Sequence, residues 1–153
     1  MEEKEIEMII NQAIEKAIKA ERIEAKEKER RKAYNLTFRY LKQYNDMVKS
    51  IGNETGDAGD TGDEFLKTME QGKKQTAIVV ANMKRCLEEL KQEQEEKGQK
   101  SKYDVLEMYF FEKMTYGQIV EKIPMGDSTP RRWVSEMVNI LAVKLFGVTA
   151  IHK

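Results

Sequence analysis

Two hydroxyl side chains and two adjacent arginines lie close together in the last third of the chain, at Ser128, Thr129, Arg131 and Arg132. An arginine can donate two parallel hydrogen bonds to O6 and N7 of guanine, and hydroxyl groups and the amides at a helix start suit phosphate oxygens. An asparagine can make a similar two-bond contact with adenine. We therefore expect one surface facing double-stranded DNA that comprises Ser128, Thr129, Arg131, Arg132, Ser135 and Asn139.

A short helix is predicted immediately before these residues. Thr115 and Gln118 have the spacing of a capping box, in which each side chain bonds to the backbone amide of the other residue. The helix therefore begins at Tyr116, and it ends at Ile123 because the residue before Pro124 is disfavoured in a helical conformation. A second helix after a tight turn completes a helix-turn-helix, whose second helix enters the DNA major groove.

The turn and the second helix have matching signals. Gly126 can adopt the positive φ that a sharp turn needs, and Asp127 or Ser128 can cap the following helix. An apolar stripe at three- and four-residue spacing predicts the buried side of that helix: Trp133, Val134, Met137, Val138, Leu141 and Leu145. The alternative interpretation is a small three-helix core whose outer face is an ordinary solvated surface.

The charge distribution adds further candidate contacts. The 153-residue chain has 27 basic and 27 acidic residues, and this net charge of zero disfavours broad coating of nucleic acid. Residues 102–153 have seven basic and six acidic residues, whereas residues 26–42 have seven basic and two acidic residues. DNA binding by the C-terminal region therefore needs a dimer or help from the basic segment. The candidate phosphate contacts are Thr115, Tyr116, Arg30, Arg31 and Lys32.

Helical periodicity predicts an all-α fold, and a content of 35% charged and 8% aromatic residues indicates long exposed helical faces. Residues 1–50 are expected to form one long helix or two abutting helices. Residues 51–63 form an acidic, glycine-rich linker. Residues 64–97 have an a/d pattern, which predicts either a hairpin with the first region or a coiled coil between chains. Residues 102–147 form the small helix-turn-helix domain.

The sequence lacks the residue patterns of disulfide-bonded proteins, metal sites and common enzyme active sites. The single cysteine, Cys86, excludes an intramolecular disulfide and fits a reducing cytoplasm. The only histidine, His152, is next to the last residue, and no phosphate-binding glycine loop, zinc-ligand spacing or nucleophile elbow is present. No apolar run is long enough to span a bilayer, and no signal peptide is recognisable. We therefore expect a cytoplasmic protein that is not an enzyme and needs no metal or cofactor.

The C-terminal region resembles a known family. Sigma factors and related phage regulators have a helix-turn-helix segment similar to residues 103–119, YDVLEMYFFEKMTYGQI. The continuation through Arg131, Arg132 and Trp133 to Gly147 resembles phage late-gene regulators of the RinA and ArpU type. The resemblance covers most of the chain. It implies helical segments on either side of a glycine-rich middle, a DNA-binding C-terminal domain, and activation of late genes of a phage or prophage in a Gram-positive host.

Three other functions remain open on the sequence alone. A stand-alone sigma-like factor would bind core RNA polymerase directly. A DNA-packaging adaptor resembling a small terminase subunit would combine the helix-turn-helix with a ring of many subunits. A coiled-coil interaction protein would have no role on DNA. For the regulator, the expected partners are promoter or operator DNA and a second copy of the chain, with host RNA polymerase as a further candidate and no membrane.

Overall fold

The computed structural model describes residues 2–52 and 63–147, with the backbone alone for residues 63–70. Five helices make up this part of the chain, and it contains no strand. They are α1 (Glu3–Gly52), α2 (Asp63–Glu96), α3 (Lys100–Phe110), α4 (Tyr116–Lys122) and α5 (Thr129–Phe146). The predicted all-α fold is therefore confirmed, whereas the predicted linker at residues 51–63 lies largely outside the described residues.

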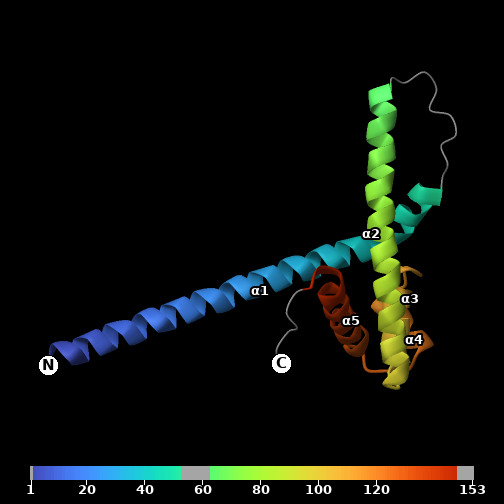
Figure 1. Ribbon diagram of the computed structural model, residues 1–153. Helices are drawn as coiled ribbons and strands as arrows, with labels where there is room; N and C mark the ends of the chain where they lie inside the picture. Colours follow the sequence, from blue (N-terminus) through green and yellow to red (C-terminus); the bar gives the residue numbers. More distant parts are fainter. Residues whose placement is uncertain (1, 53–62, 148–153) are drawn as a thin grey trace.

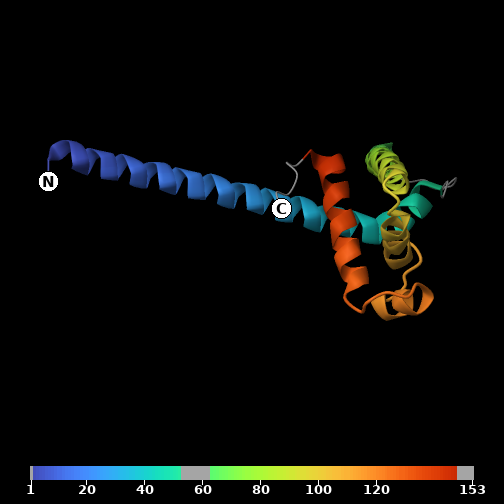
Figure 2. The same ribbon diagram turned by 90° about the horizontal axis from the view of Figure 1, so that it is seen from below.

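Helix α1 is a single helix of 50 residues, roughly 75 Å long at 1.5 Å per residue. No proline or glycine interrupts it before Gly52, and acids and bases at four-residue spacing support it. Its buried side chains are Ala33, Thr37 and Leu41, whereas residues 2–29 are exposed throughout. Residues 3–29 are termed the arm below. Figures 1 and 2 show the arm projecting away from the other helices.

Helix α2 crosses α1 near the C-terminal end of α1. Both views show the two axes at a steep angle, and the N-terminal half of α2 extends beyond the crossing (Figures 1 and 2). Of the predicted a/d positions in α2, Met83, Leu87 and Leu90 are buried in the core. The described parts of α1 and α2 are therefore a crossed pair, without the long side-by-side seam of a coiled-coil hairpin.

The core lies where α1, α2, α3 and α5 meet, and α4 packs against α3 and α5. Phe110 of α3 meets Phe38 of α1 edge-on, with 4.9 Å between the ring centroids. The predicted stripe of α5 faces this core, with Val134, Met137, Val138 and Leu141 buried and Trp133 and Leu145 partly buried. Cys86 is a buried core residue, and burial raises the pKa of its thiol, so the thiol stays protonated and unreactive.

Ion pairs link α5 to its neighbours outside the core. The ammonium group of Lys102 at the start of α3 lies 3.0 Å from a carboxylate oxygen of Glu136 in α5. The ammonium group of Lys144, near the end of α5, lies 3.6 Å from Glu89 of α2. Partly exposed pairs of this kind contribute at most about 1 kcal/mol each. They therefore add little to the stability of the fold.

Candidate nucleic-acid interface

The segment predicted to be a helix-turn-helix contains α4, a short turn and α5. The capping box of α4 is formed: Thr115 N–H donates to Gln118 Oε1 over 2.9 Å, and Gln118 N–H donates to Thr115 Oγ1 over 3.2 Å. Helix α4 ends at Lys122, and Ile123, which precedes the proline, is extended with φ −123° and ψ 109°. Both ends of α4 agree with the prediction to within one residue.

The turn before α5 differs from the prediction in two ways. Gly126 does not have a positive φ; among the described glycines, only Gly98 and Gly147 have one. A Cβ atom at Gly126 would lie 3.3 Å from Oγ1 of Thr129, whose N–H donates to the Gly126 carbonyl over 3.0 Å. The turn thus approaches α5 closely at Gly126, where any larger side chain would press against the Thr129 hydroxyl. Ser128 occupies the N-cap position, but its side chain makes no capping hydrogen bond.

The six predicted DNA-facing residues divide into two groups. Ser128, Arg131 and Arg132 are exposed around the first turn of α5, whereas Thr129, Ser135 and Asn139 are half-buried. The guanidinium carbon of Arg131 lies 5.6 Å from the centre of the Tyr116 ring in α4, within the range of a cation–π interaction. The guanidinium of Arg131 therefore lies at the junction of the two helices. The first turn of α5 is thus the open part of the predicted surface.

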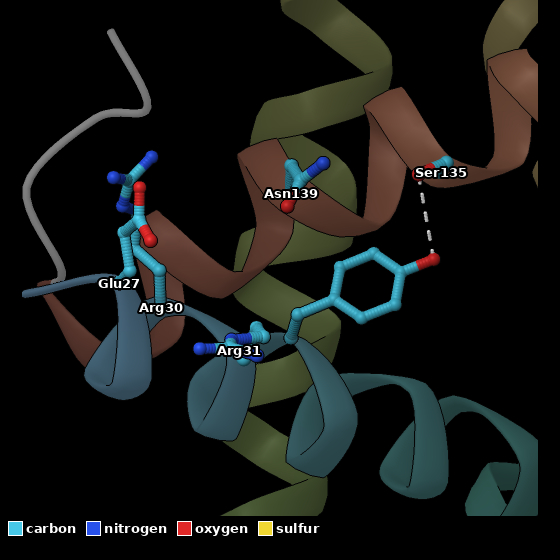
Figure 3. Close-up of a pocket in the computed structure, with 6 residues that line it drawn as sticks. Glu27, Arg30, Arg31, Ser135 and Asn139 are labelled. Carbon is cyan, nitrogen blue, oxygen red and sulfur yellow. Dashed lines mark hydrogen bonds between the residues drawn. The ribbon is translucent and has the colours of Figure 1, made fainter. Parts of the chain in front are cut away.

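Two of the half-buried residues lie in a notch between α5 and α1. Figure 3 shows the side chains that line it: Glu27, Arg30, Arg31 and Tyr34 of α1, and Ser135 and Asn139 of α5. The notch has a volume of about 440 Å³. The Tyr34 hydroxyl donates to Oγ of Ser135 over 3.5 Å, a long hydrogen bond. The notch therefore joins two sets of candidate residues that are far apart in the chain.

The packing of α1 beside α5 narrows the predicted DNA surface. Ser135 and Asn139 face side chains of α1, so a base edge can reach them less easily than it can reach the exposed arginines. Lys32 is exposed and does not line the notch. Sequence reasoning did not identify Tyr34 as a neighbour of α5, because it is 101 positions from Ser135 and no local signal links the two.

The remaining candidate phosphate contacts lie at the start of α4. The Tyr116 ring stacks on Tyr109 of α3, with 4.6 Å between the centroids and 6° between the ring planes. Burial beside Tyr109 raises the pKa of Tyr116 to about 12, so its hydroxyl stays neutral and able to donate near pH 7. Thr115 is exposed; its oxygen accepts the capping hydrogen bond, and its own O–H can still donate to a phosphate.

Positive charge predominates around the start of α5 and the notch. Four arginines lie there, Arg30, Arg31, Arg131 and Arg132. The acidic neighbours include Glu27 in the notch, Asp127 in the turn and Glu136 on α5. Glu136 accepts hydrogen bonds from Lys102 with both of its oxygens, which partly offsets its charge. The arrangement suits an extended anionic partner such as a phosphate backbone.

The described residues form neither a metal site nor a membrane-spanning helix. Within residues 2–52 and 63–147 there is no group of three or more side chains that could hold a metal ion. None of the described helices has both the length and the apolar character that a bilayer crossing requires. No protein-family model, curated protein or solved structure matches this chain.

Proposed function

We propose that the protein binds double-stranded DNA through α4 and α5, with α1 as a second point of contact. The packing of α1 beside α5 carries this proposal, because it puts Arg30 and Arg31 beside the helix that has Arg131 and Arg132 in its first turn. Residues 102–153 alone have only one more basic than acidic residue, which is little positive charge for phosphate binding. The two arginines of α1 supply the positive charge that the C-terminal helices lack.

In the proposed complex, the first turn of α5 enters the major groove. Arg132 is exposed and can reach a guanine edge, and Arg131 is held above Tyr116 in a position to contact a base edge or an adjacent phosphate. The hydroxyl groups of Ser128 and Thr115 are exposed and can donate to phosphate oxygens. Contacts to phosphate set the orientation of the helix, and contacts to base edges give the sequence preference.

We further propose that this DNA binding is regulatory. The resemblance to RinA- and ArpU-type regulators supports activation of late genes of a phage or prophage, with promoter DNA and host RNA polymerase as partners. Two measurements separate this role from its alternatives. A ring of many subunits in light scattering would support a packaging adaptor instead. Transcription by core polymerase with no other sigma factor would support a stand-alone sigma-like factor.

Binding of the full chain to duplexes selected from random DNA tests the proposed interface. Fluorescence anisotropy at several salt concentrations gives both the affinity and its salt slope. The Arg131→Ala/Arg132→Ala variant should lose specific binding while circular dichroism remains helical. The Arg30→Ala/Arg31→Ala variant should bind all sequences more weakly, with a slope smaller by about 1.8, because each phosphate contact contributes about 0.9.

Arg85→Ala is the matched control for these substitutions. Arg85 is an exposed arginine of α2 whose guanidinium lies 3.6 Å from Glu89, and the proposed complex does not use it. Its removal should therefore leave both the affinity and the salt slope unchanged. Unchanged affinity in both double variants, or an equal loss in Arg85→Ala, would contradict the proposed function.

A further inference from the structure

The arm of α1 has an apolar face that no other described element covers. Five isoleucines between residues 6 and 18 form this face and are between 44% and 53% exposed, although isoleucine is among the residues most often buried: Ile6, Ile9, Ile10, Ile14 and Ile18. The opposite side of the same turns is mostly polar, with Gln12, Glu15 and Lys19, and it also carries Met8. A continuous apolar face with a polar reverse side is typical of an interaction surface.

The spacing of the face indicates how a second arm packs on it. Its central positions follow the 4, 3, 4, 3 spacing of a coiled-coil seam: Ile6, Ile10, Ala13, Ala17 and Ala20. In an antiparallel pair centred between residues 11 and 12, Ile6 meets Ala17 of the partner subunit, and Ile10 meets Ala13 of the partner subunit. Each of these layers then has one isoleucine and one alanine, so the distance between the helices stays constant.

A parallel, in-register pair fits this face less well. It would place isoleucine against isoleucine at positions 6 and 10 and alanine against alanine at positions 13, 17 and 20. Helices held apart by the isoleucine layers would leave gaps at the alanine layers, and such gaps forfeit packing. The order of large and small residues along the seam therefore favours the antiparallel arrangement.

Charge favours the same orientation. Residues 2–7 contain four glutamates and one lysine, a net charge of −3, and residues 16–21 contain two lysines and one glutamate, a net charge of +1. An antiparallel pair places the acidic segment of each arm beside the basic segment of the other. A parallel pair would place the two acidic segments together, where they repel. The dipoles of antiparallel helices also point in opposite directions.

We infer that two copies of the chain pair antiparallel through residues 6–20 of α1, which spaces their DNA-binding regions about two turns of the double helix apart. Tyr34, which lies beside α5, is about 22.5 residues from the centre of the pair, or about 34 Å at 1.5 Å per residue. The two regions are then about 68 Å apart along the arms. One turn of DNA is about 34–36 Å, so half-sites about 20 base pairs apart present the same side of the duplex. This spacing rests on the proposed function, whereas the pairing itself does not.

Sedimentation equilibrium of the full chain without DNA tests the pairing. The wild-type protein should sediment with twice the mass of one chain, and Ile10→Glu, which puts a charge in the seam, should sediment as a single chain. Met8→Glu is the matched control: Met8 is 60% exposed on the same arm but lies off the seam, so this variant should remain a dimer. A dimer that survives Ile10→Glu overturns the inference. A monomeric wild type also overturns it, and binding of that monomer to anionic phospholipid vesicles would assign the face to a membrane surface.

Disulfide trapping tests the orientation of the pair. A mixture of Ile6→Cys and Ala17→Cys chains should form a cross-linked heterodimer, whereas Ile6→Cys alone should not cross-link. The native Cys86 is buried and does not compete in this assay. Rapid cross-linking of Ile6→Cys with itself would show a parallel pair and overturn the inference.

Duplexes with two copies of a selected half-site test the spacing. A duplex whose half-site centres are about 20 base pairs apart should bind the wild type on the order of 100-fold more tightly than a duplex with a distance of about 15 base pairs. The shorter distance turns the second half-site to the opposite side of the double helix. Ile10→Glu should lose this preference and keep its affinity for a single half-site. A dimer without the preference overturns the spacing. A dimer with no affinity for any half-site refutes the proposed function and leaves the pairing intact.

Discussion

The attachment of α1 to the other helices can be tested by truncating Leu41. Leu41 is fully buried and is the largest of the buried α1 side chains, the others being Ala33 and Thr37. Leu41→Ala removes three buried carbon atoms, which at about 0.8 kcal/mol each account for roughly 2.4 kcal/mol of folding free energy. A cavity left behind increases the cost, within the range of about 2–5 kcal/mol for such truncations.

Urea denaturation followed by fluorescence measures this loss. Trp133 is the single tryptophan and packs against the core, so it reports on the unfolding of the core and not of the arm. Met8→Ala is the matched control, because it also removes three heavy atoms from α1 but from an exposed side chain, and its cost should stay within about 0.5 kcal/mol. A loss below about 1 kcal/mol for Leu41→Ala, or equal losses in the two variants, would refute the docking of α1 on which the notch depends.

Three further predictions concern single side chains. Oε1 of Gln94 is buried without a hydrogen-bond partner, so Gln94→Leu should raise the free energy of unfolding by about 1 kcal/mol in the same urea assay. Lys113, between α3 and α4, has a φ of 57°, so Lys113→Val should be less stable than Lys113→Gly by roughly 1–2 kcal/mol in thermal unfolding. The pKa of Tyr116 is raised from 10.0 to about 12 by burial, so between these pH values the folded chain keeps a proton that the unfolded chain has lost. Stability should therefore fall as the pH rises through this window, and Tyr116→Phe should lessen the fall. A less stable Gln94→Leu variant, equal stability of the two Lys113 variants, or an unchanged pH dependence in Tyr116→Phe would contradict the respective argument.

The helices of this protein were predictable where their determinants are local. The capping box at Thr115 and the proline after Ile123 define the ends of α4 through neighbouring atoms, so the sequence indicates them directly. The apolar stripe of α5 predicted the buried side of that helix, because helical geometry brings together side chains three and four positions apart. The long, uninterrupted α1 follows from the lack of proline and glycine before Gly52.

The arrangement of the helices was not predictable, because it depends on contacts between distant segments. The contact of Tyr34 with Ser135 spans 101 positions, and neither segment has a feature that indicates the other. For the same reason the sequence did not show that Ser135 and Asn139 are half-buried beside α1. Glycine at position 126 allows either a positive φ or a close approach, and only the position of Thr129 shows which one applies.

Selection of bound duplexes from random DNA, performed in parallel with the wild type and the Arg131→Ala/Arg132→Ala variant, tests the central claim most directly. The first turn of α5 is proposed to read the major groove, so the wild type should enrich a defined motif that contains guanine. The variant should remain helical and enrich no motif. The claim would be contradicted if the wild type enriched no sequence, or if the variant enriched the same motif as the wild type.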